Sequence, residues 1–143
     1  MKKLIVLPLL LLLIVISCKT TDKTMRSDGN AAIANDTIRI ANKELEYEII
    51  IIDPGFNSWF VSHAKPRNYY SQPFLEARNT IWVSEWNNRA LQPSRYGDGL
   101  YEMRIDYQPG IDYGYEVNYM LFNYLTYFQL SNRIKLGGFE ARL

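Results

Sequence analysis

The hydrophobic pattern of the chain opens with one apolar stretch at the N-terminus. After three residues that include two lysines, residues 4–16 are apolar, with Pro8 as the one helix-disturbing residue among them. As a helix this stretch would be about 20 Å long at ~1.5 Å per residue, short of the ~30 Å hydrocarbon core of a bilayer. A charged start and a short apolar run are typical of export signals, so we assign residues 1–17 to a signal peptide.

The apolar stretch ends in Val15-Ile16-Ser17-Cys18, which resembles the lipobox read by lipoprotein signal peptidase. That pattern has an aliphatic first residue, a small third residue and an invariant Cys; Val15 stands where Leu is commoner. Cys18 is the only cysteine, so it cannot form a disulfide within the chain. We predict that Cys18 carries lipid and anchors the protein in a membrane; an ordinary signal peptide with a chance cysteine is the alternative.

The residues after Cys18 indicate where the anchor is held. Lys19 stands where some bacteria place Asp to retain a lipoprotein in the inner membrane, and residues 19–23 lack the acidic run of surface-export signals. We therefore expect an exported protein in the outer membrane that faces the periplasm. Residues 18–36 are polar without an apolar period, which predicts a lipidated, flexible tether.

Later segments alternate between apolar and polar residues as β-strands do. Residues 37–41 and 45–52 predict a hairpin whose second strand becomes apolar on both faces. Residues 101–107 alternate throughout and predict a third strand. Residues 133–136 could add a short last strand.

Two longer segments have apolar residues at helical spacing, near 73–91 and 114–130. Ser71 is placed to cap the first of them, and Asp53 to cap a short helix that begins at Pro54. A β interpretation of residues 112–117 stays open, because Tyr and Val favour strands.

Composition supports one folded unit. All 20 aromatic residues lie between Tyr47 and Phe139, and large rings help a short chain to bury a core. We predict a single α+β domain over residues 37–143, a small antiparallel sheet packed by two main helices. Without the two lysines of the signal peptide, the 16 Lys and Arg fall to 14 against 15 Asp and Glu. A net charge near −1 excludes a nucleic-acid surface and a polybasic membrane patch.

The best candidate for a polar ligand site lies in the second half of the predicted helix near 73–91. Trp86, Asn87 and Arg89 lie together there, just before a loop at residues 96–99. An amide and a guanidinium beside an aromatic ring can hold a carboxylate or a sugar. In the alternative interpretation, Asn87 and Arg89 bond loop carbonyls at the end of a helix.

His63 is the only histidine, and no thiol accompanies it, so the sequence predicts no metal site and no cofactor. It could bind a ligand or serve a Ser–His–Asp site with a serine such as Ser62, although no Gly-x-Ser-x-Gly turn is present. The alternative is an ordinary histidine at a surface or a helix end.

Carboxylates are the other residues that could carry chemistry. Paired carboxylates hydrolyse glycosides when held ~5–9 Å apart, and the chain offers Asp106, Asp112, Glu76 and Glu85. Capping and solvent-facing roles account for several of them equally well. We therefore assign no catalytic residue.

Four short motifs resemble an uncharacterised lipoprotein family of bacteroidete-type Gram-negative bacteria, a domain of unknown function. They are Glu46-Tyr47-Glu48-Ile49, Asp53-Pro54-Gly55-Phe56, Trp86-Asn87 and Asp112-Tyr113-Gly114. The resemblance covers about residues 37–137. It implies a lipid-anchored α+β unit and supplies no activity, substrate or catalytic residue.

Two classes of function remain. The favoured one is a non-catalytic envelope module, held to the membrane at Cys18, that binds another protein or a glycan. The alternative is a small hydrolase that acts on cell-envelope polymer through His63 or a carboxylate pair.

Overall fold

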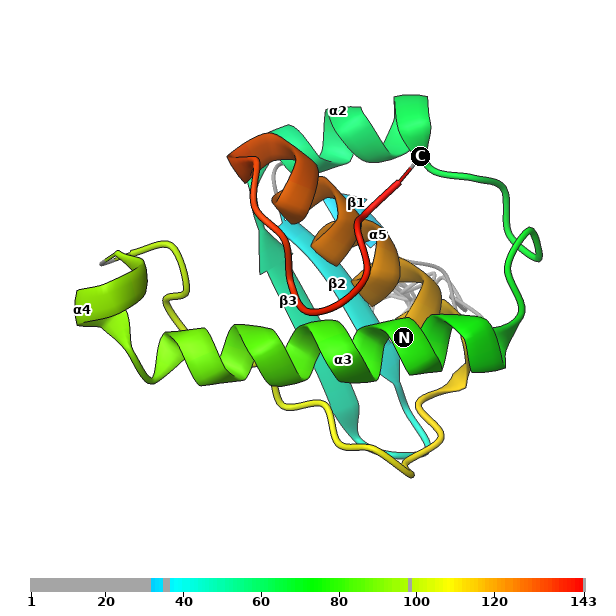
Figure 1. Cartoon of the computed structure of the whole chain (residues 1–143). Coiled ribbons are helices and arrows are strands. Elements are labelled where there is room, and N and C mark those ends of the chain that lie inside the picture. The colour runs from blue at the N-terminus through cyan, green and yellow to red at the C-terminus, as the bar shows by residue number, and fades with distance from the viewer. Residues whose placement is uncertain (1–31, 35–36, 98, 143) are drawn as a thin grey trace, which may run out of the picture.

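The structure is a computed structural model that describes residues 32–34, 37–97 and 99–142 (Figure 1). In chain order the elements are β1 (Ala32–Ala34), β2 (Thr37–Asn42), β3 (Tyr47–Ile52), α2 (Pro54–His63), α3 (Gln72–Ala90), α4 (Pro93–Tyr96) and α5 (Gly114–Asn132). The strands come first and the helices follow, so this is a small α+β fold and the predicted class is confirmed.

The strands form one antiparallel sheet in the order β1-β2-β3. The predicted hairpin is confirmed: Ile38 of β2 lies opposite Ile51 of β3. Both side chains, together with Ile40, are at most 4% exposed, because alternate residues of a strand point to the same face. Strand β1 falls inside the range 18–36 predicted as tether, so the sheet begins earlier than expected.

Helix α5 lies at the centre of the domain. It packs on β2, α2 and α3, and Figure 1 shows it in orange among these elements. All residues from 117 to 123 are buried, and at 3.6 residues per turn they cover the whole circumference of the helix. The other elements therefore surround one helix rather than cover one face of it.

Two residues were predicted to cap helices, and the structure confirms the capping bond of one of them. The Asp53 carboxylate accepts a hydrogen bond from the Gly55 amide at 2.9 Å, as an N-cap does. Ser71 occupies the N-cap position of α3, but its side chain makes no capping bond. The Asp112 carboxylate accepts from the Gly114 amide at 2.9 Å and closes the turn before α5.

The predicted strand at residues 101–107 is wrong, because this segment is irregular in the structure. Side chains of α3 hold its backbone in place of a neighbouring strand. The indole of Trp86 donates to the Met103 carbonyl at 2.8 Å, and the Asn87 amide both donates to the Ile105 carbonyl and accepts from the Ile105 amide. Only the ends of the alternating pattern are buried, and Met103 is 77% exposed.

Two further β interpretations are also wrong. Residues 133–136 form no strand; the left-handed conformation of Arg133 ends α5, and the Leu136 amide donates to the side chain of Gln129 at 2.7 Å. Residues 112–117 lead into α5, which begins at Gly114. No helix in the described part of the chain is long and apolar enough to cross a membrane.

The central position of α5 leads to a prediction with a matched control on the same helix. Leu125 is fully buried, whereas Leu130 is 39% exposed. Replacing Leu125 with Ala should lower the free energy of unfolding by about 2–5 kcal/mol, because it leaves a cavity in the core. Leu130→Ala should lower the free energy of unfolding by roughly 0.5 kcal/mol or less, apart from the small change in helix propensity. Urea unfolding of the two variants measures both losses, and equal losses would contradict the central position of α5.

Candidate functional site

The candidate residues Trp86 and Asn87 have their polar atoms engaged within the chain. As described above, both hold the irregular segment 101–107 through its backbone. The ring of Trp86 packs against Tyr101 and Phe128, with centroids 5.1 and 4.4 Å away. The structure therefore gives these two residues a structural role, and ligand binding by them stays a prediction.

Arg89 joins three parts of the chain at the end of α3. Its guanidinium contacts the Glu85 carboxylate at 2.7 Å, the Tyr101 hydroxyl at 2.9 Å and the Lys135 carbonyl at 2.6 Å. Burial lowers the pKa of Arg89, but the hydrogen bonds to Glu85 and Tyr101 outweigh it, so the net pKa is raised. This placement agrees with the alternative in which Arg89 bonds a loop carbonyl.

His63 lies away from the other three candidates, at the C-terminal end of α2. Its ring stacks on Trp59, with centroids 5.5 Å apart. Its Nδ1 is 2.7 Å from the Ser62 hydroxyl and 3.1 Å from the Trp59 carbonyl. Cys18, the predicted lipidation site, lies outside the described residues.

Two of the four candidate carboxylates come together in a polar cavity of about 250 Å³. Glu76 reaches it from α3 and Asp112 from the loop before α5. The side-chain amide of Gln72 donates to both, at 2.8 Å to Glu76 and 2.7 Å to Asp112, so both carboxylates lie beside one nitrogen atom. The other two candidates lie elsewhere: Glu85 pairs with Arg89, and the Asp106 side chain is exposed.

A buried polar network adjoins this cavity through Tyr107, one of its lining residues. The Tyr107 hydroxyl donates to the side-chain oxygen of Asn118 at 2.7 Å. The amide of Asn79 donates to the same oxygen at 3.1 Å, and Asn79 and Asn118 are fully buried. Burial, and then the negative charge of Glu76, raise the pKa of Tyr107 to about 12. Tyr107 is therefore held in a fixed arrangement at the cavity by neutral groups.

Sequence reasoning missed Gln72, Thr80 and Asn118 as parts of this site. One signal was available, because Gln72, Glu76 and Thr80 follow one another at intervals of four residues and so share one face of α3. The contribution of Asp112 had no local signal, since 40 residues separate it from Gln72. Among the described residues, no group of three His, Cys, Asp or Glu could hold a metal ion.

The fold and the cavity define a small α+β domain with one polar, carboxylate-lined cavity. The chain belongs to a family of unknown function, DUF6146, whose model matches residues 4–142. Searches of curated proteins and of solved structures found no match.

The raised pKa of Tyr107 predicts a dependence of stability on alkaline pH. Below about pH 10 the phenol is neutral in both the folded and the unfolded chain, so its contribution is fully present. Between pH 10 and about 12 the unfolded chain loses this proton while the folded chain keeps it, so stability falls as the pH rises. Tyr124, whose pKa burial also raises to about 12, acts in the same direction.

The variant Tyr107→Phe tests this dependence. It should be less stable than the parent by about 1 kcal/mol at neutral pH, because it loses one hydrogen bond to Asn118. Its free energy of unfolding should then fall less steeply than that of the parent between pH 10 and 12. Denaturant titrations at several alkaline pH values measure the two slopes, and parallel curves would show that Tyr107 does not titrate in this way.

Proposed function

We propose that this protein is an exported lipoprotein of a bacteroidete-type bacterium, anchored through lipid on Cys18 in the outer membrane. There it faces the periplasm and serves as a non-catalytic module that binds an envelope glycan. The observation that carries the binding proposal is the polar cavity at Glu76 and Asp112.

The anchor proposal is supported by the sequence at the N-terminus. Val15-Ile16-Ser17-Cys18 follows a short apolar run, and the family match begins at residue 4. The apolar run and the cysteine therefore fall within the sequence that the family model describes. A lipid-modified cysteine holds a protein firmly, since each buried CH₂ contributes ~0.8 kcal/mol.

The variant Cys18→Ala tests the anchor. In a native-like Gram-negative host, the parent should incorporate radiolabelled fatty acid and sediment with outer-membrane fragments after density separation. The variant should lose the label completely and leave that fraction, because it has no thiol for the thioether bond. A variant that keeps both the label and the membrane fractionation would rule out lipidation at Cys18.

The chemistry of the cavity suits a ligand rich in hydroxyl groups. A carboxylate accepts hydrogen bonds at up to four lone-pair sites, and the amide of Gln72 can both donate and accept. Glu76 and Asp112 have no cationic partner among the ion pairs of the described residues, so their remaining oxygen sites are free for donors. Sugar hydroxyls supply such donors in close sets, and the volume of about 250 Å³ admits one sugar ring rather than a folded partner.

Peptidoglycan sacculi, as purified envelope glycan, are the probe for this site. The detergent-solubilised protein should co-sediment with sacculi, and Glu76→Gln and Asp112→Asn should each weaken binding at least about tenfold, because each removes a charged acceptor. Glu44→Gln is the matched control, since Glu44 is an exposed carboxylate in the β2–β3 turn. Equal binding by the parent and both cavity variants would contradict the proposal.

The paired carboxylates also support a second candidate, a hydrolase of envelope glycan. Glu76 and Asp112 both hydrogen-bond to one Gln72 amide, a closeness of the kind that glycoside hydrolysis requires. The two candidates differ in a measurable product. Release of reducing ends from sacculi by the parent, and its loss in Glu76→Gln, would favour the hydrolase over the binding module.

A further inference from the structure

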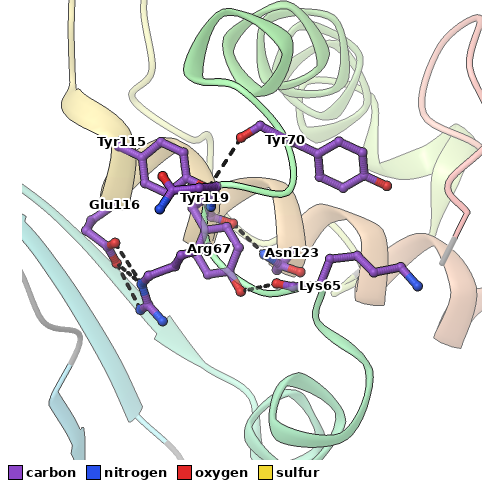
Figure 2. A network of polar contacts seen from close by, with 8 residues as sticks. Lys65, Arg67, Tyr70, Tyr115, Glu116, Tyr119 and Asn123 are labelled. Atoms are coloured by element: carbon purple, nitrogen blue, oxygen red, sulfur yellow. Dashed lines mark hydrogen bonds and ion pairs between the residues drawn. The ribbon is translucent and has the colours of Figure 1, made fainter.

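A second site lies where the α2–α3 loop meets α5. Polar contacts pin this loop to α5 (Figure 2): the guanidinium of Arg67 donates to both carboxylate oxygens of Glu116, at 2.7, 3.0 and 2.9 Å. The hydroxyl of Tyr119 donates to the Lys65 carbonyl at 2.6 Å, and the hydroxyl of Tyr115 accepts from the Asn68 amide at 2.6 Å. The loop backbone is therefore fixed on the helix surface.

Lys65 and Tyr70 of this fixed loop line a narrow slot, together with Asn123 of α5. Figure 2 shows the side chains of Lys65 and Tyr70 extending in the same direction. Trp59 and His63 of α2 and Arg142 of the C-terminal segment line the slot as well. We refer to this feature as the aromatic slot. It shares no lining residue with the polar cavity.

One of the residues that line the aromatic slot has a buried polar group without a partner. Thr126 lines the slot and is 3% exposed, yet its hydroxyl has no hydrogen-bond partner in the described part of the chain. A buried hydroxyl without a partner costs about 1–3 kcal/mol. The enclosed space beside it is about 10 Å³, roughly the room that one oxygen atom of a water or a ligand requires.

The side-chain charges around the aromatic slot have one sign. Lys65 and Arg142 line it, and no carboxylate among the described residues does. Arg142 has only a loose ion pair with Glu140, at 3.7 Å between exposed side chains. The aromatic slot therefore combines two cationic side chains with a buried hydroxyl that has no partner in the described chain, whereas the polar cavity presents two carboxylates.

We propose that the aromatic slot binds an oxyanion, a carboxylate or a phosphate group, attached to a flat apolar body. One oxygen of the anion occupies the enclosed space and accepts a hydrogen bond from the Thr126 hydroxyl. Lys65 and Arg142 balance the charge, and the apolar body packs against Trp59 and Tyr70. Charge-assisted hydrogen bonds of this kind are about twice as strong as neutral ones.

Benzoate and its neutral isostere benzamide are the first probes, with the detergent-solubilised protein observed by NMR. Benzoate should shift the side-chain signals of Trp59 and Thr126 with a saturable curve, and benzamide should bind at least tenfold more weakly. Phenyl phosphate, in a separate titration, shows which oxyanion the aromatic slot prefers. Equal binding of benzoate and benzamide, or no shifts with any of the three, would overturn the proposal.

Two variants locate the site. Thr126→Val keeps the shape of the side chain and removes the hydroxyl, so it should weaken benzoate binding about tenfold while leaving the fold intact by thermal unfolding. Lys65→Met should also weaken it, and Lys43→Met, at an exposed lysine in the β2–β3 turn, should not. Unchanged affinity in both Thr126→Val and Lys65→Met would refute the assignment. Glu76→Gln should bind benzoate normally, which separates this site from the polar cavity.

Discussion

The burial of α5 on every side along residues 117–123 is the constraint on which the rest of the structure depends. Residues 117–123 are buried in succession, so every side of this helix needs a covering element. The sheet covers one side through β2, α3 another, and α2 a third. The sheet, α2 and α3 are therefore joined into one core by their contacts with this helix.

A helix that is buried all round but carries polar residues also decides where sites can form. The amide of Asn118 is satisfied by the Gly114 carbonyl, and its oxygen by Tyr107 and Asn79, which fixes Tyr107 at the polar cavity. The hydroxyl of Thr126, two turns further on, has no such partner in the described chain. The satisfied asparagine and the unsatisfied threonine thus define two different sites on opposite halves of one helix.

The sequence predicted α3 and α5 because their apolar spacing and their flanking residues agree. The strand predicted at residues 101–107 is wrong, because only Tyr101 and Tyr107 of the alternating apolar residues are buried. The side chain of Asn87 forms the backbone hydrogen bonds that a neighbouring strand would supply. Because this pairing cannot be seen in the sequence, Asn87 was predicted to be free for a ligand, whereas its side-chain amide is already hydrogen-bonded to the backbone of Ile105. The meeting of Glu76 and Asp112 depends on how the loop before α5 closes, and no local pattern encodes that closure.

The position of α5 along the chain has a consequence for biosynthesis. This helix, Gly114–Asn132, packs on β2, α2 and α3, which all precede it in the chain, so the ribosome makes those elements before the helix that organises their core. Contacts such as that between the Asn42 side chain and the Tyr113 carbonyl span 71 residues, and they cannot form until both segments have been made. Folding of this domain therefore depends on contacts between segments far apart in the sequence, which form more slowly than local ones.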